Sequence, residues 1–160
     1  EIIDRKTAQL FAAACSLPAR IEPVRPEAIE PLERFGRALG ICFQLADDLL
    51  DFTAKASTIG KPVLSDLKEG KLTLPLLLLM PRISPRERSR IERVLAERAF
   101  STVAAEEILE MVTREGTLEE VAGEARRSAA AAREALAVFP DSAARRALEF
   151  APDFVLHRRA

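Results

Sequence analysis

The sequence predicts an all-α protein, a bundle of packed helices in a single domain that covers residues 1–160. Hydrophobic residues make up 48% of the chain, whereas aromatic residues make up only 5% and are all phenylalanine. Strands are enriched in aromatic and β-branched residues, so a core rich in alanine and leucine is more typical of helices. Apolar residues also recur at helical spacing, and capping patterns precede several of these segments.

The first two expected helices are joined by the proline-rich connection LPARIEPVRPEAIEP. The chain opens without methionine and already inside a helical pattern, so we expect a cut end and a longer natural protein. The first helix is predicted to end near Cys15. A long helix is predicted from Pro31, a residue favoured in first turns, to Phe52. Gly36 and Gly40 would let a neighbouring helix approach it closely.

A loop with one helical turn is expected in TAKASTIGKPVLSDLKEGKLT, followed by the short apolar helix LPLLLLM. Ser84 and Glu87 form a capping-box pattern with Pro85 at the first helical position, and this predicts a helix to about Arg98. Another helix is expected over residues 103–115.

A second capping-box pattern, Thr117 with Glu120, predicts a helix that Pro140 ends. The last helix is expected to start near Ser142 and to bend or break at Pro152.

The charge balance excludes some classes of function. The 24 basic and 25 acidic residues leave a net charge of −1, so no basic field favours nucleic-acid binding. The apolar run at residues 74–80 is too short to cross a bilayer. Cys15 and Cys42 lie in apolar helical segments. Two reduced core thiols in a cytoplasmic protein are favoured, and a single disulfide stays open.

The stretch FQLADDLLDF places three carboxylates, Asp47, Asp48 and Asp51, and the amide of Gln44 among apolar residues. At about 100° per residue these four side chains share one helical stripe. Burial of such charges is costly unless a cation neutralises them, and no basic residue lies on this helix between Arg37 and Lys55. Carboxylates without nearby cysteine or histidine suit Mg²⁺, which usually bridges one or two of them to substrate phosphates. The alternative is a solvated polar face.

All five lysines precede residue 72, whereas nineteen arginines are spread over the whole chain (the lysines are Lys6, Lys55, Lys61, Lys68 and Lys71). Lysines grouped around an acidic helix suggest compact positive charges for phosphate. Surface lysines in a loop are the alternative. Acids for a metal and lysines for phosphate together favour a diphosphate site.

These residues resemble the trans-type polyprenyl diphosphate synthases. FQLADDLLDF is similar to their second aspartate-rich motif, DDxxD, RKTA to their Lys-Thr site, and GK at 60–61 to their phosphate lysine. The ending AREALAVFPDSAARRALEFAPDFVLHRR is similar to their last helices. The resemblance covers nearly the whole chain, but only the C-terminal half of a family member. It implies the all-α isoprenoid synthase fold, here incomplete, and a prenyltransferase that joins an allylic diphosphate to isopentenyl diphosphate head to tail with Mg²⁺.

The resemblance also implies roles for individual residues. Asp47, with Asp48 and Asp51 near it, would hold Mg²⁺ against the allylic diphosphate, and Lys6 and Lys61 would bind that diphosphate.

Thr7 and Gln44 would face the allylic carbon and stabilise its developing cation, and Phe43 would lie beside the isopentenyl group. Asp66 and the substrate-binding Lys71 match a following region that closes over the site.

One part of the family pattern is absent from this chain. Members carry a first aspartate-rich motif upstream of the Lys-Thr site, and nothing here supplies it. We expect the same or another chain to provide that N-terminal half, and a homodimer by analogy. The segment SDLKEGKLTLPLL favours the long-chain branch of the family, which makes quinone side chains.

Two other functions stay open at this point. A non-catalytic helical subunit would not need the intact acids and lysines. Another Mg²⁺-dependent all-α terpenoid enzyme is disfavoured by the Lys-Thr and GK segments.

Overall fold

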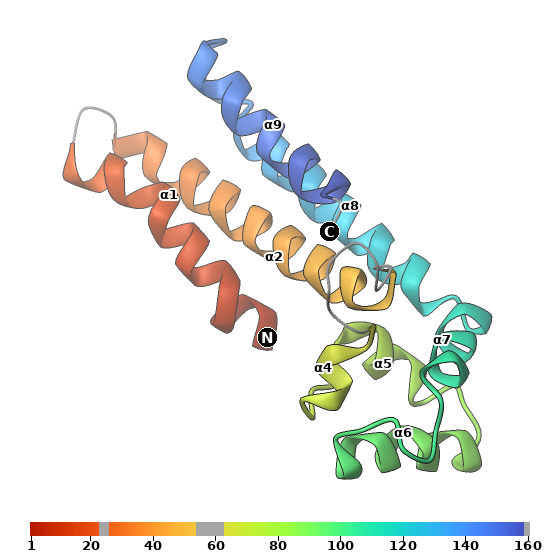
Figure 1. Ribbon diagram of the computed structural model, residues 1–160. Coiled ribbons are helices and arrows are strands. Elements are labelled where there is room, and N and C mark those ends of the chain that lie inside the picture. The colour runs from red at the N-terminus through yellow and green to blue at the C-terminus, as the bar shows by residue number, and fades with distance from the viewer. Residues whose placement is uncertain (23–25, 54–62, 159–160) are drawn as a thin grey trace. The chain divides into compact units, whose positions relative to one another are not determined.

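The computed structural model describes residues 1–22, 26–53 and 63–158, and these residues form helices and turns with no strand. The predicted all-α class is therefore confirmed. Figure 1 shows the helices in chain order: the π-helical turn η1 (Asp4–Ala8), α1 (Gln9–Ile21), the short η2 (Pro26–Ala28), α2 (Ile29–Thr53), α4 (Ser65–Lys68), α5 (Leu74–Leu79), α6 (Pro85–Glu97), α7 (Ala105–Arg114), α8 (Thr117–Ala135) and α9 (Ala143–His157). None of the described helices is long and apolar enough to cross a membrane.

Contacts divide the described chain into two compact units, each with its own core. Unit 1 consists of residues 1–46 and 123–158, and unit 2 consists of residues 47–122. The assignment of residues 1–160 to one domain stays a prediction.

The core of unit 1 is built from α1, α2, α8 and α9. Small residues from α8 meet larger ones from α2 (the buried members are Phe35, Leu39, Cys42, Ala46, Ala129, Ala132, Ala135, Leu136 and Val155). The three alanines of α8 follow helical spacing, so they form a flat face against α2. The chain then reverses, and α9 runs back beside α8 (Figure 1). Arg133 of α8 binds Asp153 of α9.

α1 approaches α2 closely at two glycines. A Cβ at Gly36 would lie 2.4 Å from the carbonyl oxygen of Phe11, and one at Gly40 would lie 2.7 Å from the Cα of Ala8. Real Cβ atoms do not come this near to backbone, so only glycine permits this spacing of the two helices. The expected close approach is confirmed.

The core of unit 2 is aliphatic and joins the end of α2 to α4, α5, α6 and α7 (its buried members are Phe52, Leu64, Leu67, Leu76, Leu79, Ile83, Ile91, Val94, Val103, Ile108, Met111 and Val112). The capping box that opens α6 is confirmed. Ser84 Oγ accepts from the N–H of Glu87, and the Glu87 carboxylate accepts from the N–H of Ser84 at 2.9 Å. Arg114 also binds Glu87, at 2.9 Å, which ties the end of α7 to the start of α6.

Several expected helix boundaries are wrong. α8 ends at Ala135, five residues before Pro140, which was expected to end it. α1 runs to Ile21 rather than to Cys15, and Pro18 lies inside it at the cost of one backbone hydrogen bond. Thr117 is the first residue of α8 rather than its cap. Its buried hydroxyl faces the carbonyl of Val112, and Glu120 binds Arg82 instead of capping.

α9 is not broken at Pro152. It continues to His157, and Pro152 is itself buried in the helix. The packing of α9 against the other helices of unit 1, with Val155 in the core, offsets the loss of one backbone hydrogen bond.

Replacing Gly36 with alanine should lower the free energy of unfolding by about 1–3 kcal/mol, because the new Cβ meets backbone that cannot move aside. Gly123→Ala in α8 is the matched control. Its Cβ would meet only guanidinium atoms of Arg127 at 3.5 Å and of Arg126 at 4.0 Å, so the better helix propensity of alanine should raise stability by about 0.5–1 kcal/mol. Urea denaturation measures both. Equal shifts of the two variants would contradict the close contact.

Glu87 should make stability depend on pH in the acid range. Hydrogen bonds from the Ser84 hydroxyl and backbone, then from Arg114, lower the pKa of Glu87 from 4.5 to about 2. A carboxyl with a depressed pKa stabilises the folded state above its unfolded pKa, and this contribution is lost as pH falls from about 4.5 to 2. Glu87→Gln keeps the capping shape without the charge. The variant should be less stable than wild type at pH 7, with a difference that shrinks below pH 4.5 in denaturant titrations. A difference independent of pH would refute this.

Candidate functional site

Lys6 and Thr7 lie in the π-helical turn η1, which interrupts the helix over residues 2–21. In this turn the N–H of Gln9 donates to the carbonyl of Asp4, five residues earlier, so the turn holds one residue more than an α-helical turn. Such π-turns are rare and are often found at functional sites. Lys6 is exposed and Thr7 is half-buried. The sequence carries no signal that would have predicted this turn.

Thr7 and Gln44 meet across the contact between α1 and α2. The Thr7 hydroxyl donates a 2.8 Å hydrogen bond to Oε1 of Gln44, 37 residues later. Gly40 lies one helical turn before Gln44 and touches Ala8, the neighbour of Thr7. The close glycine contact is therefore what brings the two side chains within reach. Since the hydroxyl hydrogen is used by Gln44, the lone pairs of Thr7 Oγ1 are available to electron-poor groups.

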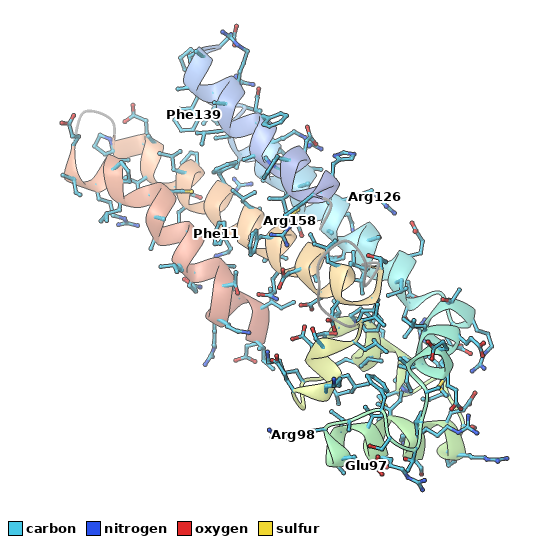
Figure 2. All side chains as sticks on the ribbon, in the orientation of Figure 1. Phe11, Glu97, Arg98, Arg126, Phe139 and Arg158 are labelled. Carbon is cyan, nitrogen blue, oxygen red and sulfur yellow. The ribbon has the colours of Figure 1, made fainter. Side chains whose placement is uncertain are left out.

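Phe43 lies next to Gln44 on α2 and is half-buried between two other side chains. Its ring centroid is 5.4 Å from that of Phe11, and Cζ of Arg158 lies 4.7 Å from the ring centroid. Figure 2 labels Phe11 and Arg158. A guanidinium over an aromatic face at this distance is a cation–π contact. Sequence reasoning missed Arg158, which follows α9 and has no motif around it.

The three acids of FQLADDLLDF occupy different environments on the last turns of α2. Asp47 is exposed, Asp51 is half-buried, and Asp48 is only 5% exposed. A fully solvated polar face therefore does not describe this stripe. Burial of a carboxylate such as Asp48 costs desolvation free energy unless partner groups compensate it, which is the cost that the sequence analysis expected for buried acids of this stripe.

Asp51 binds the start of α4 through both carboxylate oxygens. Its Oδ1 accepts from the N–H of Ser65 at 2.9 Å and from the hydroxyl of Ser65 at 2.6 Å, and its Oδ2 accepts from the N–H of Asp66 at 3.1 Å. The main-chain carbonyl of Asp51 accepts from the N–H of Leu64 at 2.8 Å.

Leu64 has a φ of 58°, in the left-handed region. This conformation costs an L-residue with a side chain about 1–2 kcal/mol, so other contacts must hold it. Its fully buried side chain in the core of unit 2 and the hydrogen bonds of Asp51 are such contacts.

Lys71 lies beside two acids after α4. Its ammonium is 2.6 Å from a carboxylate oxygen of Glu69 and 3.2 Å from one of Asp66. The hydrogen bond to Glu69, and then that to Asp66, raise the pKa of Lys71. The lysine remains half-exposed and positively charged, so it can still offer donors to an anion.

The structure therefore brings the expected site residues together in two groups. Thr7 and Gln44 contact each other in unit 1, with Phe43 adjacent on α2. Asp51 and the Asp66–Lys71 pair are connected in unit 2. Lys61 lies outside the described residues.

The acids fit a hard cation by their chemistry but not as a cluster. No group of three or more aspartate, glutamate, histidine or cysteine side chains among the described residues could hold a metal. Mg²⁺ usually takes only one or two carboxylates and completes its shell with water and phosphate oxygens. Exposed Asp47 suits this arrangement, whereas Asp51 already uses both oxygens to bind Ser65 and Asp66.

Comparison with known proteins identifies relatives of the same kind. The family model for polyprenyl synthetase matches residues 1–112. The chain is 39% identical over 158 residues to the short chain isoprenyl diphosphate synthase of Methanothermobacter thermautotrophicus, covering 99% of this chain and 48% of that protein. It is 40% identical over 147 residues to the octaprenyl diphosphate synthase of Escherichia coli, covering 92% and 45%.

A solved structure agrees with these sequence relationships. The polyprenyl synthase of Caulobacter crescentus, complexed with calcium and isoprenyl diphosphate, superposes with a TM-score of 0.85 at 40% identity. That superposition covers 99% of this chain and 48% of the other. The chain spans about half the length of these relatives. The expected family and fold are confirmed, and the chain belongs to the polyprenyl synthetase family.

Proposed function

We propose that this chain is the C-terminal part of a trans-prenyltransferase that condenses an allylic diphosphate with isopentenyl diphosphate head to tail to give a polyprenyl diphosphate. Membership of the polyprenyl synthetase family supports the class of reaction. The observation that carries the proposal is the contact between Thr7 and Gln44, because it joins two neutral oxygen-bearing side chains beside Phe43 and one residue from Lys6.

The reaction breaks the bond between the allylic carbon and its diphosphate, forms a carbon–carbon bond to isopentenyl diphosphate, and releases a proton. Positive charge develops on the allylic carbon as the diphosphate leaves. The oxygens of Thr7 and Gln44 are dipoles without net charge, so they can stabilise a carbon cation without capturing it as a carboxylate would. We assign the final proton to the released pyrophosphate, because this mechanism needs no protein base.

We assign the binding of the departing diphosphate to lysines of this chain and to a bound metal ion. Lys6 and Lys61 would bind the allylic diphosphate, and Lys71 would be a further substrate-binding lysine. Asp47 and Asp48 would hold Mg²⁺, which when bound neutralises the charge that develops on the diphosphate. Phe43 would lie beside the isopentenyl group, where its apolar ring helps to exclude water from the reacting carbons.

The wider assignment follows from the length of the relatives. The N-terminal half, with the first aspartate-rich motif, would come from the same or another chain, because the relatives are about twice as long. We infer a homodimer in the cytoplasm, and the two free cysteines, Cys15 and Cys42, are consistent with a reducing compartment. The segment SDLKEGKLTLPLL and the 40% identity to an octaprenyl diphosphate synthase support a long-chain product, of the kind used as a quinone side chain.

Asp47→Ala should lower the turnover of the assembled enzyme by roughly a hundredfold or more, because it removes an exposed carboxylate that would hold Mg²⁺. Incorporation of labelled isopentenyl diphosphate, measured over a range of Mg²⁺ concentrations, tests this. Glu92→Ala removes another exposed helical acid and should leave turnover and melting temperature unchanged. Wild-type turnover in Asp47→Ala, with the same dependence on Mg²⁺, would remove the metal role.

Thr7→Val keeps the shape of the side chain but removes the hydroxyl that binds Gln44. We expect kcat to fall by roughly ten- to a hundredfold, while the KM for isopentenyl diphosphate stays within a factor of about two, because only charge development on the allylic carbon is affected. Thr7→Ser restores the hydroxyl and should recover most of kcat. If Thr7→Val retains full kcat, the hydroxyl has no part in stabilising the cation.

A further inference from the structure

The three acids of FQLADDLLDF are chemically alike, and the structure separates one of them from the others by its contacts. Asp51 accepts three hydrogen bonds from Ser65 and Asp66, distributed over both oxygens. Two of these donors are the first backbone N–H groups of α4, which have no partner within a helix of one turn. A carboxylate from the end of α2 therefore caps a different helix.

The main chain of Asp51 supports the same connection. α2 ends at Thr53, so the carbonyl of Asp51 lies in its last turn and needs a hydrogen-bond donor from outside the helix. The N–H of Leu64 fills that role at 2.8 Å. We call Asp51 with residues 64–66 the Asp51 clasp. Its side chain and its carbonyl hold the same short segment, in which Leu64 keeps its left-handed conformation.

The clasp leads directly to a charged side chain. Asp66, whose N–H is bound by Asp51, holds the ammonium of Lys71 at 3.2 Å through its own carboxylate. The carbonyl of Asp66 also accepts from the N–H of Lys71 at 2.8 Å. The Lys71 ammonium is therefore held by Asp66 together with Glu69, which lies 2.6 Å from it, and Asp51 binds the backbone N–H of Asp66.

We propose that Asp51 is a positioning residue rather than a metal ligand: its carboxylate caps α4 and thereby sets the Asp66–Lys71 pair in place. The capping role stands on the contacts alone. The consequence for catalysis rests on the proposed function, because it requires Lys71 to bind a substrate diphosphate. In this assignment the first two acids of the motif serve the cation, and the third orders the segment that follows.

Amide hydrogen exchange tests the clasp without any assay of activity. In Asp51→Ala, exchange of the Ser65 and Asp66 amides should accelerate by between about twofold and thirtyfold, the range expected for loss of a capping side chain. Asp47→Ala removes the same side chain one turn earlier and should leave both amides unchanged. Equal acceleration in the two variants, or none in Asp51→Ala, would overturn the proposal.

A milder variant keeps the test valid if Asp51→Ala does not fold. Ser65→Ala removes only the hydroxyl donor to Oδ1, so the exchange of the Asp66 amide should rise severalfold in a protein of near-normal melting temperature. Unchanged exchange in this variant would count against the clasp. Asp51→Asn retains an oxygen acceptor and should restore part of the protection that Asp51→Ala loses.

Steady-state kinetics test the consequence for catalysis. Asp51→Asn should change the Mg²⁺ concentration for half-maximal rate by less than about threefold but raise the KM for one of the diphosphate substrates. The increase should be no larger in Asp51→Asn/Lys71→Ala than in Lys71→Ala alone, because both changes remove the same ammonium contact. A tenfold rise in the Mg²⁺ midpoint would make Asp51 a ligand. If wild type transfers no prenyl group, the proposed function fails, and the exchange result alone decides the role of Asp51.

Discussion

The close contact between α1 and α2 is the constraint on which the candidate site in unit 1 depends. Gly36 and Gly40 each cost about 1 kcal/mol relative to alanine within a helix, so their presence on α2 requires an offset. The offset is the approach of the α1 backbone to distances that a Cβ would forbid. At this spacing Thr7 reaches Gln44 and the Phe11 ring packs on Phe43. Backbone packing thus determines the position of the side chains proposed to face the allylic carbon.

The acids of α2 show how one residue type takes different tasks within two helical turns. Asp47 is exposed, while Asp48 is buried. Asp51 satisfies backbone N–H groups at the start of another helix. The sequence motif therefore shows which carboxylates are present, whereas burial and hydrogen bonding decide which of them can bind a ligand.

Local chemistry explains why some elements were predicted correctly and others were not. The Ser84 capping box involves residues three apart, so it can be recognised in the sequence, and the structure confirms it. Thr117 has the same pattern, but α8 begins one residue earlier than such a cap allows, and Glu120 binds Arg82 from another element. Pro152 remains inside α9 because packing against unit 1 outweighs its local effect.

The sequence by itself determined the helical class, the family, and the residue types that carry charge and oxygen: lysines, paired acids, and the Thr7 and Gln44 side chains. The helical class and the residue types can be read from the sequence because they depend on composition and on local spacing, and the family can be read from motifs that resemble those of its members. Only the tertiary structure decided that Lys6 and Thr7 lie on a π-turn, that Arg158 covers Phe43, and that Asp51 holds α4. The last two depend on contacts between residues far apart in the chain, and the π-turn on one additional residue in a backbone turn, so neither leaves a periodic signal in the sequence.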